Sequence, residues 1–141
     1  MKKIFIDANI LVAVLNKEYP LYSNAARVMS LADVKGCEIY TSTICLAIAW
    51  YFAEKKSGNK LARKKIALLS KHVNICSTGS LEVDNTVKNA SVHDFEDGLE
   101  YYTAIQAGCN IIVTENKDDF YLSSIAIYNS EELVKLLRED I

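Results

Sequence analysis

Residues 94–120 read DFEDGLEYYTAIQAGCNIIVTENKDDF, and this stretch decides the fold. It begins with a segment of helical periodicity that carries Asp94 and Asp97 in its first turn, and Gly108 is placed to end that helix. Residues 110–113 are then largely apolar and β-branched, which is typical of a strand buried on both faces of a parallel sheet. The polar residues 114–119 follow at the edge where open α/β sheets bind ligands.

Short apolar segments alternate with helical segments along the rest of the chain. We expect strands at residues 3–6, 38–40, 73–76, 110–113 and 125–128. We expect helices at residues 8–15, 22–31, 60–71, 80–90, 94–107 and 130–138, with Ser80 and Ser130 as N-terminal caps. A further helix starts at residue 44 after the candidate caps at residues 41–43, and residues 55–59 end it. Strands separated by helical pairs indicate parallel pairing with helices on both faces. The predicted fold class is therefore α/β, with three layers (α/β/α), a mainly parallel sheet of about five strands, and one domain spanning residues 1–141.

The composition is that of a compact globular chain, because 50% of the 141 residues are hydrophobic and one is proline. With a net charge of −2, any attraction to nucleic acid has to come from a local patch or from bound metal. No segment contains the roughly 20 apolar residues that span a bilayer, so we expect a soluble cytoplasmic protein. The cysteines form no C-x-x-C pair, which favours buried thiols over disulfides or zinc. They are Cys37, Cys45, Cys76 and Cys109.

Acidic and amide side chains gather next to the predicted strand ends. Asp7 ends the first strand, Asp97 opens the helix before the fourth strand, and Asn116 and Asp119 follow the fourth strand. These places share one edge of a parallel sheet, so we expect the side chains to meet. Clustered carboxylates repel one another unless a cation neutralises them. Oxygen ligands without histidine or cysteine suit Mg²⁺ or Mn²⁺, which can activate water for phosphodiester hydrolysis.

Three motifs carry a resemblance to a known family. They are D-A-N-I-L at residues 7–11, D-F-E-D-G-L-x-Y-x-x-A-x-x-A-G-C at residues 94–109 and I-V-T-x-N-K-x-D-F at residues 112–120. Together they resemble the PIN-domain ribonucleases, including VapC-type toxins, and most closely the subgroup with T-x-N-K-x-D-F. The resemblance covers essentially the whole chain. It implies a PIN-like fold, a metal-dependent endoribonuclease that cuts RNA, a homodimer, and a small antitoxin protein as partner.

The resemblance also implies roles for individual residues. Asp7 and Asp97 match the first and third acids of the family. Asn116 stands where a fourth acid is usual, and Asp119 is the nearby carboxylate that replaces it. The catalytic residues implied are Asp7, Asp97, Asn116 and Asp119, of which Asp7, Asp97 and Asp119 are the metal ligands. The chain departs from the family at Ile48, where members commonly carry a glutamate.

Glu54 lies six residues after Ile48 and is a poor substitute, because it falls nearly on the opposite side of the helix. The supporting residues each have a structural alternative. Asp94 is either a helix cap or part of the site, and Asn9 either supports the site or satisfies loop amides. Ser42 and Thr114 lie at strand ends, within reach of a carboxylate or phosphate, or serve as caps.

A basic run and an aromatic stripe each have a structural interpretation that involves no RNA. The basic run is interpreted as a solvated helix face, with RNA contact as the alternative. Its candidate RNA contacts are Lys55, Lys56, Arg63 and Lys64. The aromatic stripe at residues 50–52 is interpreted as core or subunit contact rather than a platform for bases.

The leading hypothesis is thus a Mg²⁺- or Mn²⁺-dependent endoribonuclease, the toxin of a toxin–antitoxin pair. Ile48 and Asn116 motivate the alternative, a catalytically weakened PIN-like module that binds RNA or a protein partner. A third hypothesis is an α/β phosphohydrolase with Asp7 as covalent nucleophile. It ranks last because it predicts D-x-D, whereas this chain has Asp7-Ala8-Asn9.

Overall fold

Strand β1 (Lys2–Ile6) lies at the centre of a five-stranded sheet in which every strand runs parallel to its neighbours. The order is β3–β2–β1–β4–β5, with β2 at Cys37–Ser42, β3 at Asn74–Cys76, β4 at Ile111–Val113 and β5 at Ala126–Tyr128. This arrangement confirms the predicted α/β class. The computed structural model describes residues 1–139, so residues 140–141 of the predicted domain lie outside the described residues.

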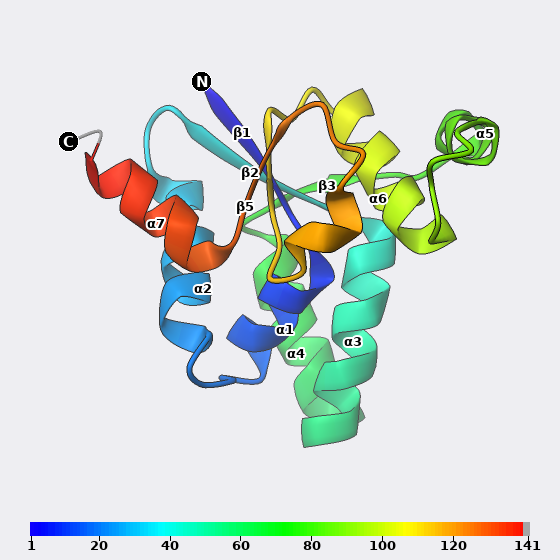
Figure 1. The fold of residues 1–141 in the computed structure, drawn as a ribbon. Coiled ribbons are helices and arrows are strands. Elements are labelled where there is room, and N and C mark those ends of the chain that lie inside the picture. Colours follow the sequence, from blue (N-terminus) through cyan, green and yellow to red (C-terminus); the bar gives the residue numbers. More distant parts are fainter. Residues whose placement is uncertain (140–141) are drawn as a thin grey trace.

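The helices are α1 (Ala8–Leu15), α2 (Tyr22–Met29), α3 (Thr43–Ser57), α4 (Asn59–Ser70), α5 (Ser80–Lys88), α6 (Phe95–Gln106) and α7 (Ser130–Glu139) (Figure 1). Two 3₁₀ helices, η1 (Ser30–Asp33) and η2 (Lys117–Phe120), complete the described elements. Helices α1 to α4 pack against one another, and α5 packs against α6. With this strand order, the right-handed rule for parallel crossovers puts α1–α4 on one face of the sheet and α5 and α6 on the other. Burial on both faces explains why every residue of β4 is buried and apolar.

The strand order reverses beside β1, because β2 and β3 follow on one side of it and β4 and β5 on the other. At the carboxyl end of β1, the backbone N–H of Asp7 donates to the carbonyl oxygen of Val113 at 3.0 Å. Asp7 and the residues after β4 are therefore neighbours. Ligands of open α/β sheets bind where the order reverses in this way.

Several predicted element ends are wrong by a few residues, and both predicted serine caps are wrong. Helix α2 ends at Met29 and continues as η1, so the α-helix does not reach residue 31. Gly79 precedes α5, and its N–H donates to the Glu82 carboxylate at 2.8 Å. Before α7, Asn129 and Glu132 exchange backbone-to-side-chain hydrogen bonds of 2.8 and 2.9 Å. Asn129 thus caps the helix because it pairs with an acid three residues on, as a capping box requires.

Two further expectations concern surfaces and thiols. All four cysteines are free, with Cys45 and Cys109 buried and the others half-buried. Tyr51 is 60% and Phe52 42% exposed, so the interpretation of this stripe as core is wrong for both rings. No helix within residues 1–139 combines the length and the apolar character needed to cross a membrane.

Candidate active site

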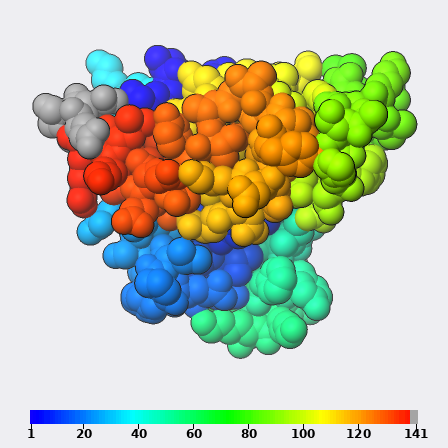
Figure 2. Space-filling view, in the orientation of Figure 1, coloured from blue at the N-terminus to red at the C-terminus, as the bar shows by residue number. Residues whose placement is uncertain are grey.

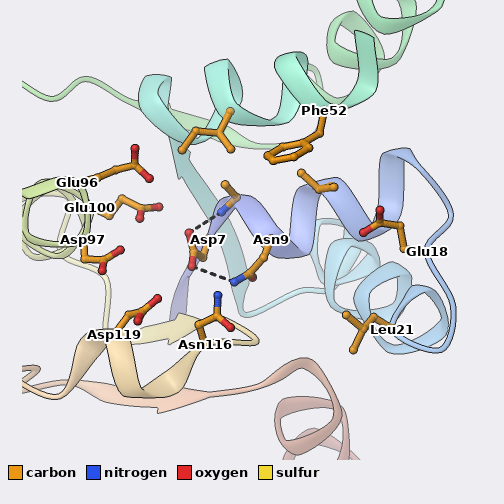
Figure 3. A pocket seen from close by; sticks show the side chains of 13 residues that line it. Asp7, Asn9, Glu18, Leu21, Phe52, Glu96, Asp97, Glu100, Asn116 and Asp119 are labelled. Atoms are coloured by element: carbon orange, nitrogen blue, oxygen red, sulfur yellow. Dashed lines mark hydrogen bonds between the residues drawn. The ribbon is translucent and has the colours of Figure 1, made fainter. Parts of the chain in front are cut away.

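A cleft of about 370 Å³ lies at the carboxyl end of β1, between α1, α3, α6 and η2 (Figure 3). From outside, the blue surface of α1 is seen between the orange segment that contains η2 and the blue-green surface of α3 (Figure 2). The cleft brings together the four residues that the sequence pointed to as catalytic. Its lining residues are Asp7, Ala8, Asn9, Val12, Glu18, Leu21, Ile48, Phe52, Glu96, Asp97, Glu100, Asn116 and Asp119.

Asp7 is held rigidly at the base of this cleft, with 7% of its surface exposed. Its Oδ1 accepts a hydrogen bond from the N–H of Ala8 at 2.6 Å, which caps α1. Its Oδ2 accepts from the Thr114 hydroxyl at 2.8 Å and from the Asn9 amide at 3.3 Å. Asp7 therefore both caps a helix and lines the cleft, so the two interpretations of this residue are compatible.

Asn9 and Thr114 join the start of α1 to the loop after β4. The Thr114 hydroxyl oxygen accepts from the Asn9 amide at 3.2 Å and from the N–H of Asn116 at 3.0 Å. The Asn9 carbonyl oxygen accepts from the N–H of Glu115 at 3.2 Å. Because these bonds cross between two segments, they fix the position of Asn116 relative to Asp7.

Helix α6 supplies acids from the opposite side of the cleft, as Figure 3 shows for Glu96, Asp97 and Glu100. Burial raises the pKa of Asp97 to about 7, with further contributions from the negative charges of Asp119, Asp94 and Asp7. Burial, followed by repulsion from neighbouring acids, also raises the pKa values of Glu96 and Asp119. These shifts express a local excess of negative charge that a cation would relieve.

Asp94 itself lies at the N-terminus of α6, where its carboxylate accepts a hydrogen bond from the N–H of Asp97 at 3.0 Å. It is exposed and does not line the cleft. Of the two interpretations left open by the sequence, this geometry favours the helix cap.

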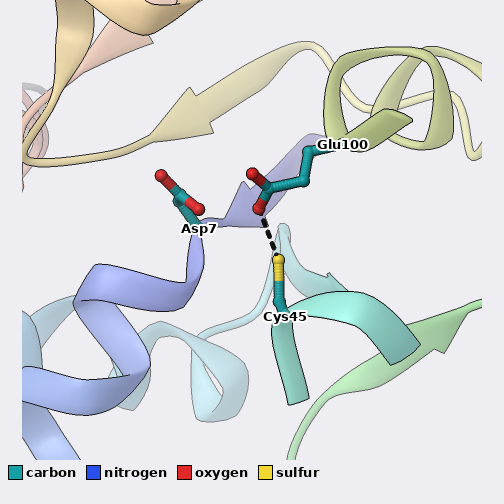
Figure 4. A group of neighbouring side chains, drawn as sticks. All are labelled: Asp7, Cys45 and Glu100. Carbon is teal, nitrogen blue, oxygen red and sulfur yellow. Dashed lines mark hydrogen bonds between the residues drawn. The ribbon is translucent and has the colours of Figure 1, made fainter. Parts of the chain in front are cut away.

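Three acids of the cleft were not predicted from the sequence: Glu18, Glu96 and, most deeply buried, Glu100. Glu100 is 2% exposed, and burial followed by the charge of Asp7 raises the pKa of its carboxyl to about 10. The Cys45 thiol donates to its Oε1 at 2.6 Å (Figure 4). One ligand atom each from Asp7, Cys45 and Glu100 lies within 4.8 Å of the others. The available signal was spacing, because Asp94, Asp97 and Glu100 recur every three residues along one side of a helix.

Ser42 and Glu54 do not line the cleft. The Ser42 hydroxyl is buried and accepts from the N–H of Cys45 at 3.1 Å, which caps α3. Glu54 accepts from the Trp50 indole at 2.7 Å and from the Asn59 amide at 3.1 Å. Residue 48 does line the cleft, but as isoleucine it contributes apolar atoms only.

The basic candidates lie outside the cleft lining and are exposed. Lys56 donates to the backbone carbonyl oxygen of Asn16, and the Arg63 guanidinium lies 5.1 Å from the centre of the Trp50 ring. Lys55 and Lys64 complete this set. The side chains of Lys56 and Arg63 are thus already engaged with the protein.

The donor atoms of the cleft fit a hard divalent cation. Carboxylate oxygens from β1, α6 and η2 converge, and no histidine is among the described lining residues. Oxygen-rich sets of this kind are typical of Mg²⁺ and Mn²⁺ sites. Burial and, after it, repulsion between neighbouring acids raise the pKa values of Asp97 and Glu100, and a bound cation would offset both effects.

Comparisons with known proteins agree with this architecture. Residues 3–118 match the family model for the PIN domain. Ribonuclease VapC1 of Aquifex aeolicus (strain VF5) is 23% identical over 135 residues, which cover 93% of this chain and 92% of that protein.

Solved structures of other proteins share the fold. The structure of VapBC2 from Rickettsia felis, bound to a DNA fragment from the promoter, matches with a TM-score of 0.69 at 21% identity and covers 90% of this chain and 98% of that one. Mycobacterium tuberculosis VapC20, a sarcin–ricin loop cleaving toxin, matches with a TM-score of 0.61 at 19% identity, over 77% and 86% of the two chains. Because these sequence identities are low, the similarity to the solved structures establishes the shared fold alone.

Proposed function

The chain belongs to the PIN-domain family, and from that premise we propose that it is a Mg²⁺- or Mn²⁺-dependent endoribonuclease. The observation that carries this proposal is the convergence of Asp7, Asp97 and Asp119 on one cleft from three separate segments of the chain. A site of this kind is electrostatically unfavourable without a cation, which supports a metal-dependent activity.

In this proposal, Asp7, Asp97 and Asp119 hold the cation. Asn9 and Thr114 orient the Asp7 carboxylate through the hydrogen bonds on its Oδ2. Asn116 lines the same cleft, where its amide can donate to a phosphate oxygen of RNA. When bound, Mg²⁺ or Mn²⁺ would supply an activated water and neutralise charge on the phosphodiester.

The proposal extends to partners. A relative named Ribonuclease VapC1 and a fold shared with VapBC structures support a role as the toxin of a toxin–antitoxin pair, held by an antitoxin protein. A homodimer remains part of the proposal, and exposed Tyr51 and Phe52 on α3 are candidates for a protein contact.

One observation favours a second candidate function. Ile48 places apolar atoms in the cleft at the position where the family resemblance implies a glutamate. A PIN-like module that binds RNA or protein with little catalysis would tolerate that residue. Metal binding and RNA cleavage, measured together, distinguish this module from the enzyme.

The test compares RNA cleavage and Mn²⁺ binding in two isosteric variants. We expect Asp7→Asn to abolish cleavage and to weaken Mn²⁺ binding at least tenfold, roughly the scale of lost metal-site interactions. Asparagine caps helices as well as aspartate does, so α1 should stay intact. Asp118→Asn, which removes one charge from an exposed residue outside the cleft lining, is the matched control. Unchanged cleavage in Asp7→Asn would remove the assignment.

A further inference from the structure

Glu100 is the most deeply buried acid of the cleft, with 2% of its surface exposed. It extends from α6 across the end of β1, so that its carboxyl lies between Asp7 and Cys45 (Figure 4). The Cys45 thiol donates to Oε1 at 2.6 Å. A thiol is a weak donor, so this bond does little to offset the burial of a charge.

No basic side chain compensates Glu100 in the part of the chain that the structure describes. No lysine, arginine or histidine is among the described residues of the cleft lining, and the Lys117–Glu132 ion pair lies on the surface. The nearest strong charge is the like charge of Asp7, and one ligand atom each from Asp7, Cys45 and Glu100 lies within 4.8 Å of the others. An anionic carboxylate in this position requires a bound cation.

The carboxyl of Glu100 also lies against a particular side of α3. Cys45 and Ile48 are three residues apart on that helix and therefore share one side of it. Cys45 contacts Glu100, and Ile48 lines the cleft beside it without any polar atom. Helix α6 thus brings a carboxylate to the side of α3 that lacks one.

We propose that Glu100 is a metal ligand that, together with Asp7, holds the divalent cation from the buried side of the cleft, in the place of a carboxylate that Ile48 does not provide. This inference rests on the proposed metal-dependent function. It gives a role to Glu100, an acid to which the sequence pattern assigned none. It also predicts that α6 supplies two ligands, Asp97 and Glu100, one turn apart.

The test measures Mn²⁺ affinity by titration calorimetry, without RNA. We expect Glu100→Gln to weaken Mn²⁺ binding at least tenfold, roughly the scale of lost metal-site interactions. Glutamine keeps the shape of the side chain and an oxygen that can accept from Cys45. Cys45→Ala removes that thiol and keeps the carboxylate, so its Mn²⁺ affinity should stay close to that of the wild type. Glu131→Gln, at an exposed site on α7, controls for loss of one charge.

A second arm uses rescue. Adding Ile48→Glu to Glu100→Gln should recover most of the lost affinity, because residue 48 lines the same cleft. If Glu100→Gln fails to fold by circular dichroism, Glu100→Asp replaces it, since it keeps the charge but shortens the side chain and should also weaken binding. Binding by Glu100→Gln at the wild-type level overturns the inference alone. An equal loss in Glu131→Gln and Glu100→Gln also overturns it, because the loss would then follow from the change in net charge alone. Absence of Mn²⁺ binding in the wild type removes the proposed function as well.

Discussion

Single carboxylates in the cleft differ in how strongly the fold constrains them. Asp7 accepts hydrogen bonds from Ala8, Asn9 and Thr114, so its orientation is set before any ligand arrives. Glu100 accepts from the Cys45 thiol and is buried beside the like charge of Asp7. This contrast implies that Asp7 is the pre-oriented ligand, whereas Glu100 is the group whose burial most needs a cation.

The raised pKa values give a prediction about the metal-free protein. Folded Asp97, with a pKa of about 7, and Glu100, with a pKa of about 10, hold protons more tightly than the unfolded chain does. Their contribution to stability is present below the unfolded values, near 4, and is lost as pH rises through the folded values. We therefore expect the urea midpoint in EDTA to fall as the pH rises from about 5.5 to about 8.5, because over this range the unfolded chain has released protons that the folded carboxyls still hold.

Glu100→Gln is the control for that measurement, because Glu100 is the group whose pKa differs most between the folded and the unfolded chain. Its urea midpoint should fall less steeply with pH than that of the wild type. Identical pH profiles in the two proteins would mean that Glu100 titrates in the folded state as it does in the unfolded chain. Added Mn²⁺ should raise the wild-type midpoint more at pH 8 than at pH 6, because binding competes with protons.

Among the elements, α6 combines a structural and a chemical role. Its N-cap is Asp94, and Asp97 and Glu100 follow at intervals of three residues. The opposite side packs on α5, with Gly98 close to the Thr86 side chain. Asp97 and Glu100 thus line the cleft, whereas the N-cap Asp94 stabilises the helix and does not line the cleft.

That division gives a prediction for Asp94. Asp94→Ala removes the acceptor for the N–H of Asp97, so we expect a loss of about 1 kcal/mol in the free energy of unfolding. Asp94→Asn keeps an acceptor and should cost less. Mn²⁺ affinity should change little in either variant, because Asp94 does not line the cleft. Urea denaturation and calorimetry measure the two effects separately. A large loss of Mn²⁺ affinity in Asp94→Asn would instead place Asp94 in the site.

For the molecule as a whole, the sheet order decides which distant residues meet. The parallel strands, and the meeting of Asp7, Asp97 and Asp119 at one edge, could be predicted because strand ends are visible in the sequence and parallel strands share an edge. Glu100 could not be found in that way, since it lies in the middle of a helix and only the packing of α6 on the sheet places its carboxyl next to Asp7 and Cys45 (Figure 4). For Ser42 the sequence left a helix cap and a site role open, because the same residue types serve both purposes after a strand, and its hydrogen bond from the N–H of Cys45 makes it a cap.

The charge of the whole molecule makes a final prediction about RNA. Its net charge of −2 and acidic cleft oppose binding of phosphate, so local basic residues must contribute. Lys55 follows the cleft residue Phe52 by three positions on α3 and therefore continues the same side of that helix. We expect Lys55→Glu to weaken RNA binding and to reduce the slope of log affinity against log salt by about 0.7, the value for one phosphate contact on a single strand.

Fluorescence anisotropy over a KCl series, in the Asp7→Asn background to prevent cleavage, measures this slope. Lys35→Glu is the matched control, because Lys35 precedes β2 at the amino ends of the strands, away from the cleft. Its slope should equal that of the background. Equal losses in Lys55→Glu and Lys35→Glu would show that the basic run on α3 and α4 is an ordinary solvated surface, and RNA would then have to be held through the metal-bound cleft alone.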